Sequence, residues 1–171
     1  MTTSVTNMDI HDLSRSARTY GVENYFIVTP LEDQLALVDR ILTHWRTPRS
    51  KEGHPDRFEA LSRVRLAKSF EEVKQAIIAT HGVAPEVVLT DAKPHSRSES
   101  YASYRSELED PKRGGRPVIL VFGTGWGVAQ NFYPEVHRIL APVYGPEGNG
   151  GYNHLSVRSA VGVILDRLFG H

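Results

Sequence analysis

The chain has 171 residues, which is long enough for one α/β domain with a sizeable core. Its 20 basic and 20 acidic residues cancel, which argues against a generally basic nucleic-acid-binding protein but leaves local basic patches open. The lack of cysteine excludes disulfides, thiolate catalysis and cysteine metal sites, and it favours a cytoplasmic protein. No apolar run approaches the roughly 18 residues of a membrane span, and the first residues do not form a secretory signal.

Helices and strands alternate in the first part of the chain. A helix is predicted to begin after Asn7 or Asp9, either of which can cap it, and to end at Gly21, which suits a left-handed closing residue. A strand follows at residues 25–28. Directly after it, a T-x-x-E capping box that contains a proline predicts a second helix, which ends near Trp45.

The middle of the chain is richer in turns. Residues 46–57 are polar, contain two prolines and a glycine, and predict a loop. Further along, a second capping box, S-x-x-E, begins another helix. The predicted elements are, in order, a strand at 64–67, a helix from 69 to about 80 that ends at Gly82, a strand at 86–90, a loop at 91–98, a helix at about 99–108 and a turn at 111–115.

Five apolar residues at 118–122 lead into three glycines at alternate positions, 123, 125 and 127. A short unbroken apolar run is typical of a strand that is buried on both faces of a parallel sheet. Because glycine lets the backbone approach a ligand, and ligands bind at the carboxyl ends of such strands, the pattern predicts a ligand loop. The remaining predicted elements are a strand at 138–141, a glycine-rich loop at 142–153 and a final helix with apolar residues from Val157 to Leu168. The alternation predicts a single α/β domain with a mainly parallel sheet flanked by helices.

The glycine loop does not match the two commonest nucleotide motifs. A dinucleotide fingerprint, G-x-G-x-x-G, would need a glycine at Val128, and no G-K-[ST] tripeptide exists for a P-loop. A strand-to-helix turn with glycines for tight packing therefore stays open as the alternative. No histidine and acidic residues have convincing zinc spacing, so no metal site is predicted, and no G-x-S-x-G or H-E-x-x-H motif identifies catalytic residues.

Two further groups of polar residues remain. The segment N-H-L-S-V-R-S places polar side chains and free backbone N–H groups at the start of the last helix, where capping by Asn153 or Ser156 is the simpler interpretation. On the first helix, Asp12 and His11 precede Arg15 by three and four residues, so the three side chains can share one face. The alternative for this group is a solvated helix with a surface ion pair worth under about 1 kcal/mol.

Three segments resemble the motifs of the SPOUT class of RNA methyltransferases. Residues 7–22 are similar to the first motif (an asparagine, an arginine and a later glycine-valine), residues 120–128 to the second (a strand with a glycine loop) and residues 153–161 to the third (an Asn-x-x-Ser helix start). Over its whole length the chain resembles a bacterial family described as S-adenosylmethionine-dependent RNA methyltransferases, related to the C-terminal region of tRNA (guanine-N1)-methyltransferases. Related chains begin with an additional strand and turn before the segment that matches residues 3–7, so we expect either that the start of this chain is truncated or that this member lacks the family's first strand.

The resemblance implies a deep C-terminal trefoil knot, a homodimer, and S-adenosylmethionine bound in the knot by the backbone groups of three loops. The residues in the corresponding positions are Thr90, Asp91, Phe122, Gly123, Thr124, Gly125, Trp126, Gly127, Tyr144, Gly145, Pro146, Asn153, His154, Leu155 and Ser156. Glycine loops suit such a pocket because adenine needs apolar walls and a few backbone donors and acceptors.

The resemblance also implies methyl transfer to a base nitrogen or ribose oxygen of tRNA or rRNA. Arg15, the arginine of the first motif, would orient or activate the acceptor; the further candidate catalytic residues are Asn7, His11, Asp12 and Ser156. RNA would lie over cations of two loops, for which solvated surface charge is the alternative. These cations are Arg46, Arg49, Lys51, Arg57, Lys93 and Arg97. The alternative function is a non-catalytic knotted module that binds the cofactor or RNA.

Overall fold

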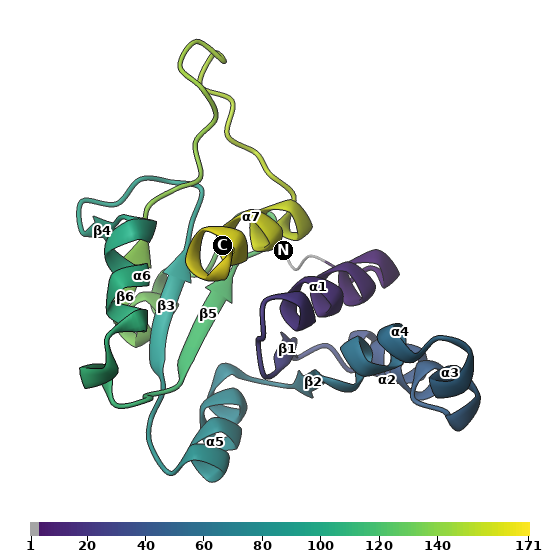
Figure 1. The fold of residues 1–171 in the computed structure, drawn as a ribbon. Helices are drawn as coiled ribbons and strands as arrows, with labels where there is room; N and C mark the ends of the chain where they lie inside the picture. The colour runs from purple at the N-terminus through teal and green to yellow at the C-terminus, as the bar shows by residue number, and fades with distance from the viewer. Residues whose placement is uncertain (1–3) are drawn as a thin grey trace. The chain divides into compact units, whose positions relative to one another are not determined.

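The structure is a computed structural model that describes residues 4–171 (Figure 1). The chain divides into two compact units, one up to Ala76 and one from Ile77 onward. This boundary lies inside the helix α5 (Phe70–His81). The single domain expected from the sequence stays a prediction. Within residues 4–171, no helix is both long and apolar enough to cross a membrane.

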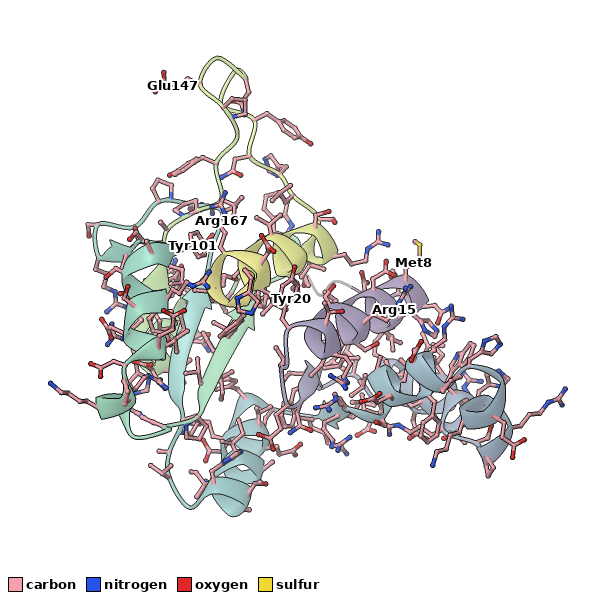
Figure 2. All side chains as sticks on the ribbon, viewed as in Figure 1. Met8, Arg15, Tyr20, Tyr101, Glu147 and Arg167 are labelled. Atoms are coloured by element: carbon pink, nitrogen blue, oxygen red, sulfur yellow. The ribbon has the colours of Figure 1, made fainter. Side chains whose placement is uncertain are left out.

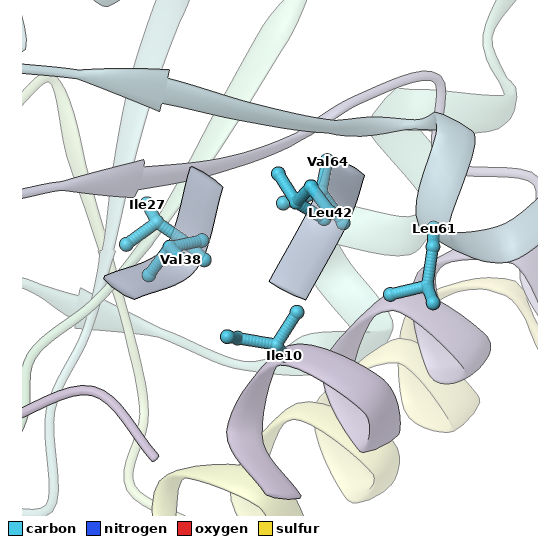
Figure 3. Close-up of a cluster of buried hydrophobic side chains, with 6 residues drawn as sticks. All are labelled: Ile10, Ile27, Val38, Leu42, Leu61 and Val64. Carbon is cyan, nitrogen blue, oxygen red and sulfur yellow. The ribbon is translucent and has the colours of Figure 1, made fainter. Parts of the chain in front are cut away.

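Unit 1 consists of helices packed around a pair of short parallel strands. The strand β1 (Tyr25–Val28) pairs in register with β2 (Val64–Ala67). The helices are α1 (Asn7–Thr19), α2 (Glu32–Trp45), α3 (Pro48–Gly53), α4 (Pro55–Ser62) and the first part of α5. Figure 3 shows the core, in which α1, α2, α4 and both strands contribute Ile10, Ile27, Val38, Leu42, Leu61 and Val64.

Helix α1 is closed at both ends by local hydrogen bonds. The predicted cap at Asn7 or Asp9 is wrong, because Thr6 is the N-cap and Asp9 is its partner in a capping box. The Thr6 hydroxyl accepts from the Asp9 N–H at 3.2 Å, and the Asp9 carboxylate accepts from the Thr6 N–H at 3.0 Å. The predicted closure at Gly21 is confirmed, since this glycine follows the C-cap with a φ of 73°.

The predicted capping box at the start of α2 is also wrong. Helix α2 begins at Glu32, its N-cap is Leu31, and no side chain caps it. The reason is that Thr29 directly follows β1 and is still bonded to β2: its N–H donates to the carbonyl oxygen of Ala67 at 3.0 Å. Thr29 is therefore two residues before the N-cap position, and its side chain cannot cap this helix.

Residues 46–57, predicted as a loop, contain all of α3 and the beginning of α4. Pro48 and Pro55 each stand in the first turn of a helix, where a missing N–H costs nothing because that N–H would have no helical partner. The Thr47 hydroxyl caps α3 by accepting from the Ser50 N–H at 3.2 Å. The two prolines therefore start short helices here instead of marking turns.

Unit 2 is built on a four-stranded sheet in the order β4-β6-β3-β5, with every pair parallel. Its strands are β3 (Glu86–Thr90), β4 (Ser98–Glu99), β5 (Val118–Phe122) and β6 (Arg138–Leu140). Its further helices are α6 (Tyr101–Glu109) and α7 (Val157–Phe169), and its 3-10 helices are η1 (Pro111–Arg113) and η2 (Gln130–Glu135). The predicted α/β class with a parallel sheet and flanking helices is confirmed. The trefoil knot stays a prediction.

Both faces of this sheet are covered within unit 2. Tyr104 of α6 and Ile164 of α7 pack with Val88 and Leu140 on one face, and Figure 2 shows Tyr101 of α6 beside Arg167 of α7. The η2 segment covers Leu89, Val136 and Ile139 on the other face. The strand buried at every residue is β3 in the middle of the sheet, whereas β5 lies at the edge and is only half-buried, contrary to the prediction for residues 118–122. An apolar run does not reveal a strand's position in its sheet.

A buried carboxylate joins the amino ends of β3 and β6 to the helical segments. Glu86 is 7% exposed and accepts from Arg113 at 2.6 Å, from Arg138 at 2.6 Å and from the Tyr104 hydroxyl at 3.0 Å. Burial pushes the pKa of Glu86 upward, but the hydrogen bonds from these three side chains outweigh it and leave the pKa below its usual value. The network lies at the end of the sheet opposite to the candidate site.

Candidate functional site

The carboxyl ends of three neighbouring strands meet at one edge of the sheet in unit 2. Thr90 at the end of β3 lies opposite Phe122 of β5 and Leu140 of β6. Its hydroxyl donates to the carbonyl oxygen of Val121 at 2.9 Å, which ties two of the strand ends together. The following loops, residues 91–97, 123–129 and 141–156, therefore leave the sheet side by side, where open α/β sheets bind ligands.

Asp91 fixes the conformation of the first loop. Its carboxylate accepts from the Lys93 N–H at 3.0 Å, from the Tyr133 hydroxyl at 3.3 Å and, at 2.9 Å, contacts Nε2 of His95. Burial raises the pKa of Asp91, but these contacts outweigh burial and leave the pKa below its usual value. Asp91 is therefore a charged residue that already has partners, so we expect it to shape the pocket more than to contact a ligand.

The glycine loop folds back on itself. An added Cβ at Gly123 would lie 2.8 Å from two backbone atoms of Gly127, and the Gly127 N–H donates to the carbonyl oxygen of Thr124 at 3.2 Å. Gly125 and Gly127 have φ values of 57° and 86°, which other residues rarely adopt. The tight-packing interpretation therefore explains Gly123. It leaves unexplained why Trp126, at the tip of the loop, is 84% exposed.

The third loop is tied to the first. In Figure 1 it extends well beyond the strand ends, between β6 and α7. The Asn153 side-chain amide donates to the carbonyl oxygen of Ala92 at 3.0 Å, so Asn153 bridges two loops instead of capping α7. The cap is Ser156, whose hydroxyl accepts from the Ser159 N–H at 3.2 Å. His154 lies against Tyr152, with the ring centroids 5.5 Å apart.

These loops fit S-adenosylmethionine by the chemistry that they present. Four large apolar side chains on the second and third loops are exposed: Trp126, Tyr144, Tyr152 and Leu155. Exposed apolar side chains on loops that follow strand ends, next to glycine-rich backbone, suit a ligand with an aromatic ring. Of the predicted cofactor residues, Thr90, Phe122, Asn153 and Ser156 have defined places at the strand ends or between the loops.

The candidate catalytic residues Asn7, His11, Asp12 and Arg15 lie on α1 in unit 1, whereas Ser156 lies in unit 2. Asn7, Asp12 and Arg15 are exposed, and Figure 2 shows Arg15 on α1. His11 is half-buried. Burial and the nearby Arg57 lower the pKa of His11, so its ring is neutral at pH 7. Among the described residues its Nδ1 atom has no hydrogen-bond partner.

The candidate RNA-binding cations differ in what they contact. The Arg46 guanidinium donates to the backbone carbonyl oxygens of Leu61 and Val64, which gives it a structural role at the end of α4. Arg57 lies over the ring of Trp45 at 4.8 Å and Lys51 over the ring of Phe58 at 5.9 Å. The remaining three, Arg49, Lys93 and Arg97, are exposed.

Several residues that shape these sites were missed. His95 and Tyr133 hold Asp91, and Trp45 contacts the rings of His11, His44 and His54. The Asp91–His95 spacing of four residues and the adjacency of His44 and Trp45 are local signals, while the contacts of Tyr133 with Asp91 and of His11 with Trp45 join distant parts of the chain. Across residues 4–171, no three histidine or acidic side chains are grouped in a way that could hold a metal ion.

Comparison with known proteins identifies the family. A family model described as "SAM-dependent RNA methyltransferase" matches residues 1–170. A tRNA (guanine-N(1)-)-methyltransferase from Nitratidesulfovibrio vulgaris (strain Hildenborough) is 43% identical over 168 residues, which are 98% of this chain and 37% of the relative. The chain thus spans little more than a third of that relative's length.

Solved structures agree on the fold. The crystal structure of a methylase family protein from Neisseria gonorrhoeae is similar with a TM-score of 0.63 and 18% identity, over 94% of this chain and 75% of that one. The SpoU methyltransferase AviRb from Streptomyces viridochromogenes was solved in complex with the cofactor AdoMet. It has a TM-score of 0.59 and 16% identity, over 97% of this chain and 56% of that one. The fold, the three loops at one edge of the sheet and a match along nearly the entire sequence lead to one conclusion: the chain belongs to the family of S-adenosylmethionine-dependent RNA methyltransferases.

Proposed function

We propose that this chain transfers a methyl group from S-adenosylmethionine to a base nitrogen or ribose oxygen of RNA, with tRNA as the first candidate substrate. The observation that carries the proposal is the meeting of three loops at the carboxyl ends of β3, β5 and β6, within a chain of this family. The relative from Nitratidesulfovibrio is named for tRNA. The expected trefoil knot belongs to the same proposal.

The loops of unit 2 would hold the cofactor. Glycine-rich backbone at 123–127 and the segment from Tyr144 to Ser156 would supply donors and acceptors, and the exposed apolar side chains would contact the adenine. When bound, S-adenosylmethionine supplies a methyl group on a positively charged sulfur, which a lone pair of RNA can attack. The protein's contribution is to hold the two reactants in line and to exclude water.

The acceptor would be oriented from α1. Arg15 is exposed, so its guanidinium can donate to RNA oxygens and stabilise negative charge that develops on the acceptor. Asn7 and Ser156 are further candidates for the same task, whereas Asp12 is a candidate for orienting the acceptor by accepting hydrogen bonds from it. His11 is the candidate that could accept a proton, because burial of part of its ring lowers the pKa and leaves the ring neutral.

We further propose that two copies of the chain form a homodimer and that the protein acts in the cytoplasm. The RNA phosphates would contact the exposed cations on α3, α4 and the loop after β3. Arg49, Lys51, Arg57, Lys93 and Arg97 are exposed, as phosphate contacts require. Arg46 is left out of this set because its guanidinium already binds backbone carbonyls. The lack of cysteine suits a reducing compartment.

The decisive experiment is transfer of a radioactive methyl group from S-adenosylmethionine to total RNA, followed by nucleoside analysis. We expect labelled RNA with the wild-type chain and a loss of at least a hundredfold with Arg15→Ala. Arg18→Ala is the matched control: Arg18 lies one turn further along α1, and its guanidinium pairs with Glu59.

Calorimetry separates the two candidate functions. Cofactor binding without any label in RNA would favour a non-catalytic module. No heat at millimolar S-adenosylmethionine would contradict both functions that rely on the cofactor, and an Arg15→Ala protein with normal activity would remove Arg15 from its role.

A further inference from the structure

Unit 1 contains an open groove between α1 and α2 that the proposed cofactor and phosphate contacts leave unused. Its volume is about 430 Å³, within the range of pockets that take small organic ligands. The lining residues are Asn7, Leu37, Arg40, Ile41, His44 and Trp45. All six belong to α1 or α2, so the groove is complete within unit 1.

The lining combines an apolar floor with a polar rim. Leu37, Ile41 and Trp45 are half-buried, so each offers part of its apolar surface to the groove. Arg40 and His44 are exposed at the rim. None of the six lining residues is acidic. A flat apolar ring that carries a negatively charged group would therefore find both an apolar surface and a cation here.

Trp45 is surrounded by one arginine and three histidine side chains. The guanidinium carbon of Arg57 lies 4.8 Å from the centroid of the Trp45 ring. The ring centroids of His11, His44 and His54 lie 5.3, 5.4 and 5.9 Å from it. Within residues 40–57 there are five arginines and lysines against two acidic residues. This local excess contrasts with the zero net charge of the chain and favours an anionic partner.

We propose that this groove binds one unpaired nucleotide of the substrate RNA, with its base on Leu37, Ile41 and Trp45 and its phosphate beside Arg40. The inference rests on the proposed function. It narrows the substrate to RNA that presents an unstacked base in a loop, bulge or end, since a base inside a duplex cannot reach an apolar floor of this kind. Contact of a base with aromatic and apolar side chains is tolerant of sequence, so the groove would select RNA structure more than base identity.

The test uses Trp45 as its own reporter. The chain has two tryptophans, and Trp126→Phe leaves Trp45 as the single one. In this background the full chain is titrated with adenosine 5′-monophosphate while tryptophan fluorescence is recorded. We expect a saturable change in fluorescence, because a base that enters the groove contacts Trp45 directly.

Two variants locate the binding. Leu37→Glu places a carboxylate on the floor of the groove and is expected to weaken the binding of the nucleotide at least tenfold. Ala36→Glu adds the same charge to the neighbouring exposed position of α2, which does not line the groove, and is expected to bind as the parent does. Equal affinities for Leu37→Glu and Ala36→Glu would overturn the proposal.

Two further comparisons separate a base pocket from a simple anion site. Ribose 5-phosphate is expected to give no fluorescence change at the concentration where the mononucleotide saturates; an equal response would overturn base recognition. A single-stranded oligonucleotide is expected to compete for the groove at least tenfold better than the blunt duplex of the same sequence, and equal competition would contradict the proposed selectivity.

The outcome is independent of methyl transfer. If the RNA is labelled but no nucleotide binds at Trp45, the groove proposal is contradicted and the enzymatic proposal stands. If a nucleotide binds but no RNA is labelled, the enzymatic proposal is contradicted and the groove stands as a nucleotide site.

Discussion

At the scale of single residues, the glycines at 123, 125 and 127 can be explained in two ways. Both a packed turn and a cofactor loop need glycine, so the sequence could not separate them. The structure assigns Gly123 to packing, because the space for its Cβ is occupied by backbone atoms of Gly127. Backbone atoms cannot move aside as the end of a side chain can. A side chain at position 123 would therefore push the two ends of the loop apart.

We therefore predict that Gly123→Ala raises the Kd for S-adenosylmethionine at least tenfold, which corresponds to a loss of about 1.4 kcal/mol of binding free energy. The added methyl group forces the backbone of the loop apart, while β5 and the core keep their packing. Calorimetry measures the change in Kd. Gly53→Ala is the matched control, since a Cβ there meets nothing within 4 Å and the residue lies in α3. An unchanged Kd for Gly123→Ala would place the cofactor elsewhere.

Other residues of the site were beyond prediction from sequence. Asp91 could be placed at a strand end, but its partners His95 and Tyr133 come from a loop conformation and from η2. Likewise, Asn153 looked like a cap and instead binds the carbonyl oxygen of Ala92, 61 residues earlier in the chain. Such contacts depend on how loops pack in three dimensions, and no local pattern encodes them.

At the scale of elements, local signals worked where a segment is bounded by clear turns. The strands at 25–28, 64–67, 86–90 and 118–122 have the predicted bounds. The strand order β4-β6-β3-β5 was not predicted, because it depends on contacts between distant segments. The helices α3 and α4 were missed because prolines that begin a helix look like prolines that begin a turn.

The two capping motifs of unit 1 give a direct prediction. We expect Thr6→Ala to lower the free energy of unfolding by about 1 kcal/mol, since it removes the side-chain cap of α1. Thr29→Ala is the matched control, because the Thr29 hydroxyl accepts from the Leu31 N–H at 3.3 Å and caps no helix. Urea unfolding followed by circular dichroism measures both. A larger loss for Thr29→Ala than for Thr6→Ala would favour the capping box inferred from the sequence.

The Glu86 network predicts how the stability of unit 2 depends on pH. The pKa of Glu86 is lower in the folded chain than in the unfolded one, so the unfolded state takes up the proton first as the pH falls. The stabilisation is therefore complete above the ordinary glutamate pKa of about 4.3. It is lost as the pH falls from there toward the lower pKa of the folded state.

We predict that Glu86→Gln is less stable than wild type at pH 7 by about 2 kcal/mol, because Arg113 and Arg138 lose their charged acceptor. Its stability should also decline less than that of wild type below pH 5. Urea unfolding at a series of pH values measures both effects. Glu109→Gln is the control, since its ion pair with Arg105 is exposed and is expected to contribute under about 0.5 kcal/mol. Parallel pH profiles for wild type and Glu86→Gln would contradict the prediction.

At the scale of the whole molecule, the residues proposed for the cofactor and the arginine proposed for the acceptor belong to different units. The cofactor loops belong to unit 2, and Arg15 belongs to α1 in unit 1. In the proposed homodimer, we place α1 of one copy at the cofactor loops of the other. This arrangement makes two copies necessary for activity and gives the dimer a role beyond stability.

Mixing two inactive chains tests this arrangement. Arg15→Ala would remove the acceptor-orienting residue and keep the cofactor loop, whereas Gly123→Val would disrupt the loop and keep Arg15. After the two proteins are unfolded together and refolded, half of the dimers should contain one copy of each, and each mixed dimer should have one intact site of its two. We therefore expect roughly a quarter of wild-type methyl transfer, while each variant alone stays inactive. Mixed dimers that form, as shown by separately tagged chains, but transfer no methyl group would show that each chain builds its site from its own α1.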